Sequence, residues 1–223
     1  MSPMPTRGTE DVLAQIESHR MVMVVRGESV DGARSAIEAA VDGGVRVVEV
    51  TYTVPGAGAL IAELVGDGGD LVVGAGTVRT LEQAREAIDA GARFLVSPGL
   101  DLAVLSHAVA RDVLMIPGIL SATEALTAID HGAAAVKLFP ASVMGPAYLR
   151  ALRGPVPGLK VMPSGGIDST NAGEWLRAGA TAVGVGGALS PGGPIDARIA
   201  QSITDEARRT LLALSSPGEG SSR

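Results

Sequence analysis

Lys137 is the residue of this sequence whose type and surroundings most clearly indicate chemistry. It lies in the apolar segment AVKLFPA (135–141) and is one of two lysines among 18 lysine and arginine residues; the other is Lys160. Arginine stays protonated in proteins, whereas a lysine shielded from water can lose its proton and attack a carbonyl carbon. We therefore interpret Lys137 as a lysine that forms a Schiff base. The alternative is a lysine at a strand end whose ammonium group extends into water.

Glu49 is the acid that we expect to act beside Lys137. Side chains alternate between the two faces of a strand, and this places Glu49 on the same face as Val45, Val47, Thr51 and Thr53. Lys137 shares a face with Phe139 and with Ala133 and Ala135, whose small size leaves it room. The opposite faces are apolar and suited to packing against helices: Val48, Val50, Val136 and Leu138. A buried ion pair without a catalytic role is the alternative, although desolvation makes such pairs costly.

The composition excludes several classes of protein. The chain has 223 residues, a net charge of −6 and a pI of about 5.1, so we expect no nucleic-acid partner. It has no cysteine, which excludes disulfides and thiolate metal sites. It contains no signal-like N-terminal segment and no apolar run near the roughly 20 residues of a membrane span, so a cytoplasmic protein that does not enter the membrane is expected.

Short apolar runs alternate with amphipathic stretches along the whole chain. Eight runs have the character of strands: 21–25, 45–50, 71–76, 93–98, 113–118, 134–140, 160–166 and 182–187. Stretches typical of helices lie at 9–19, 31–43, 80–91, 101–111, 121–132, 169–180 and 194–214, with Thr9 as a possible cap of the first.

Eight strands that alternate with helices predict an α/β fold, a TIM (β/α)8 barrel with a short N-terminal helix. We assign residues 1–214 to this single domain and expect 215–223, rich in serine and glycine, to form a flexible tail. An open doubly wound sheet is the second possibility. In a TIM barrel the active site lies at the carboxyl ends of the strands, where Glu49 and Lys137 fall.

Two glycine-rich turns follow the last two predicted strands, VMPSGGI (161–167) and GVGGAL (184–189). Glycine allows close backbone approach, and its free N–H groups can bind an anion, so these turns predict a phosphate site. Tight turns without a ligand are the alternative. The three histidines, His19, His107 and His131, fall in or just after predicted helices, so we expect no metal site.

Eight motifs in the same order make the chain resemble the 2-keto-3-deoxy-6-phosphogluconate (KDPG) and 4-hydroxy-2-oxoglutarate (KHG) aldolase family over about residues 10 to 210. They are VVRG (24–27), VVEVT (47–51), VGAGTV (73–78), VSPGL (96–100), PGI (117–119), VKLFPA (136–141), PSGGI (163–167) and VGGAL (185–189). The resemblance implies a class I aldolase on a TIM barrel, a homotrimer, and a covalent lysine imine with no metal or other cofactor.

The resemblance also implies roles for individual residues. Lys137 would form the imine and Glu49 would be the general acid and base. The residues implied to contact the rest of the substrate are Arg26, Thr51, Thr53, Thr77, Pro98 and Phe139. Those implied to hold its phosphate are Ser164, Gly165, Gly166, Gly186 and Gly187.

Three positions depart from the family pattern, and Ser164 is the mildest change because it keeps the hydroxyl. Family members usually carry Arg or Asn where this chain has Thr53, and Ser where it has Ala188; Ser164 stands where Thr is usual.

We expect cleavage of KDPG to pyruvate and glyceraldehyde 3-phosphate, both small molecules. The alternatives are a KHG aldolase that forms pyruvate and glyoxylate, and a barrel that binds or isomerises sugar phosphates.

Overall fold

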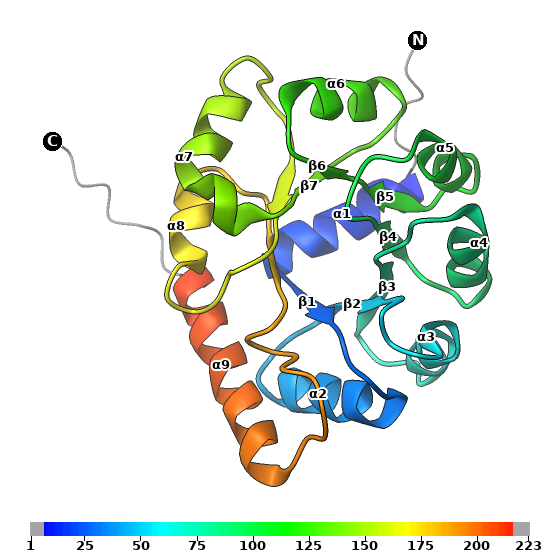
Figure 1. Ribbon diagram of the computed structural model, residues 1–223, viewed down its shortest axis with the longest axis vertical. Coiled ribbons are helices and arrows are strands. Elements are labelled where there is room, and N and C mark those ends of the chain that lie inside the picture. The colour runs from blue at the N-terminus through cyan, green and yellow to red at the C-terminus, as the bar shows by residue number, and fades with distance from the viewer. Residues whose placement is uncertain (1–6, 216–223) are drawn as a thin grey trace, which may run out of the picture.

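Parallel strands alternate with helices along residues 7–215, the part of the chain that this computed structural model describes (Figure 1). The strands are β1 (Met21–Val25), β2 (Val47–Thr51), β3 (Val72–Gly76), β4 (Phe94–Val96), β5 (Leu114–Ile116), β6 (Gly118–Ile119), β7 (Val136–Leu138), β8 (Val161–Pro163) and β9 (Val183–Val185). The helices are α1 (Arg7–His19), α2 (Val30–Asp42), α3 (Ala57–Gly66), α4 (Leu81–Asp89), α5 (Leu102–Ala110), α6 (Ala122–Asp130), α7 (Ala141–Arg153), α8 (Ala172–Arg177) and α9 (Ala197–Ser215).

The strands close into the predicted TIM barrel. One sheet has the order β5-β4-β3-β2-β1-β9 and the other β6-β7-β8, and every pairing is parallel. A parallel bridge between Ser164 and Gly184 joins the end of β8 to β9. The two sheets also meet where β5 continues into β6. The ring is therefore complete, and the open-sheet alternative is wrong.

Pro117 explains why one predicted strand is divided into β5 and β6. Proline has no N–H group and cannot donate to a neighbouring strand. Its carbonyl oxygen still accepts a hydrogen bond of 2.8 Å from the Lys137 N–H. β5 and β6 thus occupy a single strand position in the barrel, and β7 is the neighbouring strand.

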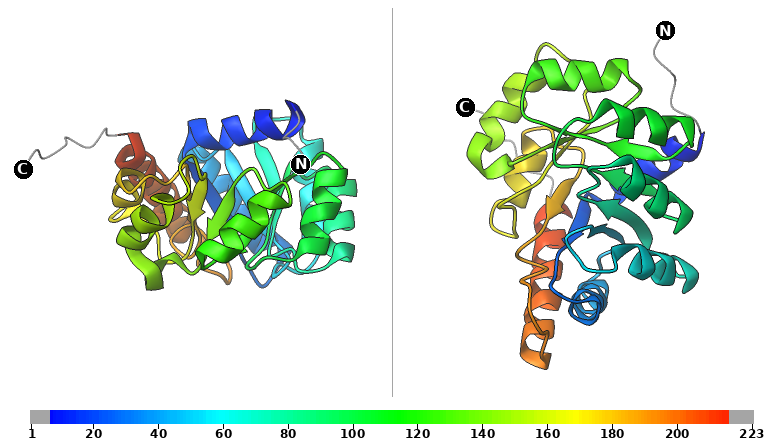
Figure 2. Two further views of the ribbon diagram at one scale, coloured as in Figure 1. Left: turned by 90° about the horizontal axis from the view of Figure 1, so that it is seen from above. Right: turned by 45° about the vertical axis from the view of Figure 1, so that its right-hand side comes forward.

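Helix α1 covers the end of the barrel at which the strands begin, as the left view of Figure 2 shows. Its apolar residues Val12, Leu13 and Ile16 pack against side chains inside the barrel, among them Phe94 and Met162. Water is thereby excluded from this end of the interior. We call the opposite end, where the strands finish, the mouth of the barrel.

The side chains of the strands divide between interior and exterior largely as predicted. Outward-facing residues join the larger apolar cluster shared with the outer helices: Val48, Val50, Val136 and Leu138. Ala135 lies in the interior cluster. Val45 and Ala133, predicted to face inward, belong to the outer cluster, because they precede β2 and β7 and do not share their alternation.

Some boundaries differ from the prediction. Helix α1 begins at Arg7, so Thr9 lies within its first turn and is not its cap. Helix α9 extends to Ser215, and the rest of the predicted tail lies outside the described residues. Helices α3 and α7 were not predicted, since glycines surround the start of α3 and Gly145 and Pro146 interrupt α7. Within residues 7–215, none of the helices combines the length and apolar character that crossing a bilayer requires.

Candidate active site

Glu49 and Lys137 meet inside the barrel, as predicted. Glu49 lies on β2 and Lys137 lies on β7. These two strands are not neighbours, so the side chains meet across the interior of the barrel. Glu49 is 0% exposed and Lys137 3%. Lys137 Nζ donates to Glu49 Oε1 over 3.3 Å, a longer contact than the 2.7–2.9 Å usual for charged partners. The second carboxylate oxygen, Oε2, is buried and has no partner among the described residues.

Burial raises the pKa of the Glu49 carboxyl above its ordinary value of 4.5, because the ionised form loses its hydration. The charge and hydrogen bond of Lys137 and the charge of Arg26 lower this pKa without overcoming the effect of burial. A carboxyl group with a raised pKa accepts and returns protons near neutral pH more readily than an ordinary glutamate. A raised pKa is one of the properties that a general acid and base requires.

Gly76 provides the space for the Glu49 carboxylate. It ends β3, the strand beside β2, and a Cβ atom there would overlap Oε1 and lie 2.6 Å from the carboxyl carbon. Sequence reasoning missed this role. The signal was the glycine in the GAGTV turn, which becomes informative only when the register of β2 and β3 is known.

Gly76→Ala is expected to displace Glu49, to lower kcat and to reduce the free energy of unfolding by about 1–3 kcal/mol, the usual cost of overpacking. Steady-state kinetics and urea denaturation measure both effects. Gly66→Ala is the matched control, because a Cβ at Gly66 meets nothing within 4 Å. Equal behaviour of the two variants would contradict the spatial role of Gly76.

The two threonines after Glu49 form a short hydrogen-bonded chain. Thr51 is fully buried, and its hydroxyl donates to the Val25 carbonyl over 2.7 Å. The hydroxyls of Thr51 and Thr53 lie 2.6 Å apart, and Thr53 is exposed. Since the Thr51 proton is directed at Val25, Thr53 donates to Thr51. Thr51 thus joins β1 to β2, and Thr53 is the member that a ligand in the mouth can reach.

Four further predicted residues lie where strands end. The Phe139 ring centroid is 5.5 Å from Lys137 Nζ, close enough for a cation–π contact. Thr77, directly after β3, has a φ of 55°, which is unusual for a β-branched residue. Arg26 follows β1 and is exposed, and Pro98 follows β4 and is exposed. The structure brings these residues to the same end of the barrel as Glu49 and Lys137.

Ser190 fixes the backbone of Arg26 and is a second residue that sequence reasoning missed. Its hydroxyl accepts from the Arg26 N–H over 2.9 Å and donates to the Arg26 carbonyl. Ser190 is 6% exposed. It lies in the segment after the second glycine pair, so it links the end of β1 to the predicted phosphate loop.

The two glycine-rich turns lie next to each other at the mouth. Ser164 is 4% exposed and forms the bridge to Gly184, whose missing side chain leaves space for the Ser164 hydroxyl. Gly165 and Gly166 have φ values of 103° and 72°, which favour glycine. Their N–H groups, and that of Gly187, have no acceptor among the described residues. These donors are available to an anion.

A metal site does not emerge from the described part of the chain, in which no group of three or more His, Asp or Glu residues is arranged to hold a metal ion. His19 ends α1, His107 lies in α5 and His131 follows α6. None of them lies at a strand end.

A buried lysine and glutamate in a TIM barrel are compatible with a Schiff-base aldolase, and comparison with known proteins shows this class. The family described as KDPG and KHG aldolase matches residues 12–205. The 2-dehydro-3-deoxy-phosphogluconate aldolase of Treponema pallidum is 39% identical over 74% of this chain and 79% of its own. The KHG/KDPG aldolase of Escherichia coli is 33% identical over 86% of this chain and 90% of its own.

Comparison with solved structures supports the same class of protein. The 2-keto-3-deoxy-6-phosphogluconate aldolase of Zymomonas mobilis superposes with a TM-score of 0.79 at 30% identity, covering 92% of this chain and 97% of that one. The KDPG aldolase of Legionella pneumophila, captured with pyruvate as a covalent carbinolamine, gives 0.79 at 29% identity, covering 89% and 97%. The chain belongs to the KDPG and KHG aldolase family. It is a carbon–carbon lyase of the pyruvate aldolase type.

Proposed function

We propose that this protein cleaves 2-keto-3-deoxy-6-phosphogluconate to pyruvate and glyceraldehyde 3-phosphate, with Lys137 as the nucleophile and Glu49 as the general acid and base. The observation that carries the proposal is the buried contact between Lys137 Nζ and Glu49 Oε1 at the mouth of the barrel. The Treponema pallidum relative carries the name of this activity. Purified protein assayed for pyruvate release from this substrate tests the proposal, and absence of release would contradict it.

The geometry supports a sequence of proton transfers between two neighbouring groups. Glu49 takes a proton from Lys137, and the neutral amine attacks the 2-keto carbon to form a carbinolamine. Glu49 returns the proton to the carbinolamine hydroxyl, which leaves as water, and an iminium remains. Glu49 then accepts the proton of the C4 hydroxyl while the C3–C4 bond breaks and its electron pair moves into the iminium. Protonation of the resulting enamine at C3 and hydrolysis release pyruvate and free Lys137.

The two ends of the substrate would be bound on opposite sides of this pair. Arg26 and the exposed Thr53 would meet the carboxylate, with Phe139, Thr77 and Pro98 around the pyruvate half. The free N–H groups of the turns at Gly165 and Gly187 would hold the phosphate, with Ser164 adding a hydroxyl. These assignments are supported by their common location at the strand ends and by the family pattern.

Gly187→Asp is expected to raise the KM for a phosphorylated substrate by about tenfold or more, because a carboxylate would oppose the phosphate. A side chain fits there, since a Cβ at Gly187 meets nothing within 4 Å. Borohydride trapping of pyruvate, which has no phosphate, should be unchanged. An unchanged KM would remove the Gly187 turn from the phosphate site.

The phosphate distinguishes 4-hydroxy-2-oxoglutarate, which lacks one, from the two phosphorylated sugar acids, which are stereoisomers of each other. A relative from Escherichia coli, 34% identical over 81% of this chain, is named 2-dehydro-3-deoxy-6-phosphogalactonate aldolase, and another is named for both KHG and KDPG. Comparing kcat/KM for 2-keto-3-deoxy-6-phosphogluconate, 2-dehydro-3-deoxy-6-phosphogalactonate and 4-hydroxy-2-oxoglutarate shows which of the three substrates the protein prefers. A higher value for 4-hydroxy-2-oxoglutarate would make the KHG reaction the principal one.

We further propose a homotrimer and a cytoplasmic location. A designed cage built from symmetric oligomeric domains contains a chain 30% identical to this one, with a TM-score of 0.79 over 87% of this chain. Light scattering coupled to gel filtration should give a mass three times that of the 22.4 kDa chain. A monomeric mass would contradict the homotrimer. Cell fractionation tests the location.

A further inference from the structure

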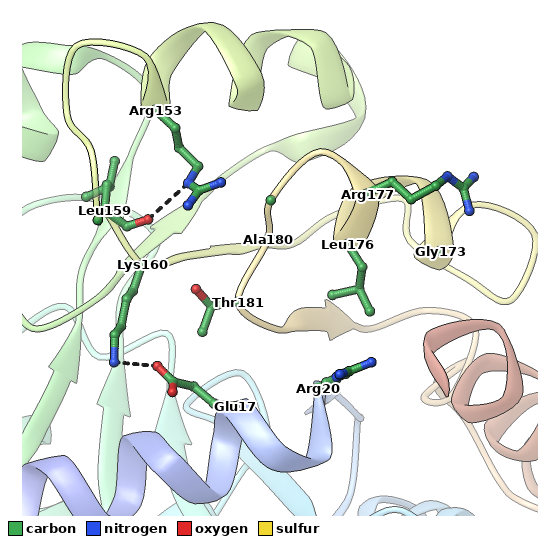
Figure 3. Close-up of a pocket in the computed structure, with 12 residues that line it drawn as sticks. Glu17, Arg20, Arg153, Leu159, Lys160, Gly173, Leu176, Arg177, Ala180 and Thr181 are labelled. Carbon is green, nitrogen blue, oxygen red and sulfur yellow. Dashed lines mark hydrogen bonds and ion pairs between the residues drawn. The ribbon is translucent and has the colours of Figure 1, made fainter. Parts of the chain in front are cut away.

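A cavity lies at the end of the barrel opposite the catalytic mouth. It has a volume of about 660 Å³, within the range of small-molecule sites. It is formed where β8 and β9 begin, between the end of α1, the segment joining α7 to β8, and α8 (Figure 3). Glu49 and Lys137 lie toward the other ends of the strands, so nothing bound in this cavity would touch them.

The cavity collects positive charge in an acidic protein. Four cationic side chains line it from four segments of the chain: Arg20, Arg153, Lys160 and Arg177. Glu17 is the one carboxylate among the lining residues and is paired with Lys160 over 2.5 Å, as Figure 3 shows. The whole chain carries a net charge of −6, so the local charge is opposite in sign to the total. Like charges gathered in this way repel each other unless an anion lies between them.

The arginines keep donors available for such an anion. Arg20 uses Nη1 to hold the Leu214 carbonyl at 2.8 Å, and Arg153 uses Nε to hold the Leu159 carbonyl at 3.3 Å. These bonds fix both guanidinium groups and leave their other N–H groups without acceptors among residues 7–215. The Arg177 side chain makes no hydrogen bond or ion pair in the same part of the chain. Arginine N–H groups match phosphate oxygens in pairs.

The guanidinium group of Arg153 lies against Gly179, the glycine that follows the end of α8. A Cβ atom at Gly179 would overlap Nη1 of Arg153 and lie 2.9 Å from its guanidinium carbon. The glycine, with a φ of 98°, therefore allows the guanidinium to lie against the backbone beside the cavity.

We infer that this cavity is a binding site for a small polyanion with two or more phosphate groups, separate from the active site. A single phosphate would fill a small part of the volume and could not reach cations that come from four segments. A compound with several phosphate groups pairs with several of them at once. The inference does not depend on the proposed reaction, because the cavity shares no residue with the catalytic mouth.

Isothermal titration with inorganic pyrophosphate tests the inference on the full-length protein. The wild type should bind pyrophosphate with saturation, more tightly than sulfate at equal ionic strength. Arg153→Gln/Arg177→Gln should weaken binding by about tenfold or more, equivalent to about 1.4 kcal/mol. Thermal melts establish that each variant is folded, and Arg177→Gln alone serves if the double variant is unstable.

Two controls separate the cavity from other positive surfaces. Arg85→Gln/Arg93→Gln removes the same charge from two exposed arginines outside the cavity and should leave binding unchanged. Gly187→Asp should remove only pyrophosphate bound at the mouth, and the binding that Arg153→Gln/Arg177→Gln weakens should remain in it. The inference is overturned if pyrophosphate does not bind, if both double variants weaken binding equally, or if Gly187→Asp is the variant that abolishes it.

Discussion

Lys137→Ala is expected to reduce aldol cleavage by at least about 10⁴-fold, because no other group in the mouth can form an imine with the 2-keto carbon. The nearest nitrogen-bearing side chain among the predicted site residues is that of Arg26, which cannot act as a nucleophile at neutral pH. Initial rates of pyruvate release at the wild-type pH optimum measure the loss. Substantial remaining turnover would contradict the assignment of Lys137.

Lys137→Arg separates the covalent role of the lysine from its role as a counter-charge. Arginine keeps a positive charge beside Glu49, so the variant should be more stable than Lys137→Ala, in which the carboxylate is buried without a partner. It should nevertheless be as inactive as Lys137→Ala. Recovery of activity in Lys137→Arg would mean that the charge, and not the imine, is what the reaction requires.

Glu49→Gln is expected to lower kcat by about 10²–10⁴-fold, the usual contribution of a general acid and base. The amide occupies the same volume next to Gly76 but cannot exchange protons. Imine formation should slow together with cleavage, since the same group serves both steps in the proposed sequence. Stopped-flow measurement of each step tests this, and an unchanged kcat would remove Glu49 from the role.

The raised pKa of Glu49 predicts two effects of pH. The ionised carboxylate is the base, so activity should decline on the acid side at a pH above the ordinary glutamate value of 4.5, and this decline should disappear in Glu49→Gln. Between 4.5 and the raised value the folded protein also holds a proton that the unfolded chain releases. The free energy of unfolding should therefore fall as pH rises through this window, and Glu49→Gln should lose that slope.

Much of the fold and of the catalytic pair could be predicted from the sequence, because both depend on local pattern. Alternation within VRVVEV and AAVKLFP placed Glu49 and Lys137 on inward faces, and the count of strands then brought their ends together. What could not be predicted depends on register between strands. Gly76 leaves space for Glu49, and Ser190 hydrogen-bonds the backbone of Arg26. Both contacts are between segments that are remote in sequence.

Local interruptions caused the remaining differences. Pro117 divides one predicted strand into β5 and β6, although the two remain at one position in the barrel. Gly145 and Pro146 interrupt the helical periodicity of α7, so the sequence pattern did not predict this helix. Val45 and Ala133 were assigned to the interior because the alternation was extended past the points at which β2 and β7 begin.

The central claim is that Lys137 forms an imine with a 2-keto acid, and intact mass spectrometry after incubation with pyruvate and borohydride tests it most directly. The account predicts one pyruvate-sized adduct per chain, mapped to Lys137 and absent from Lys137→Ala. Lys160, the other lysine of the chain, is held by Glu17 at the opposite end of the barrel and should remain unmodified. No adduct, or an adduct on Lys160, would contradict the claim.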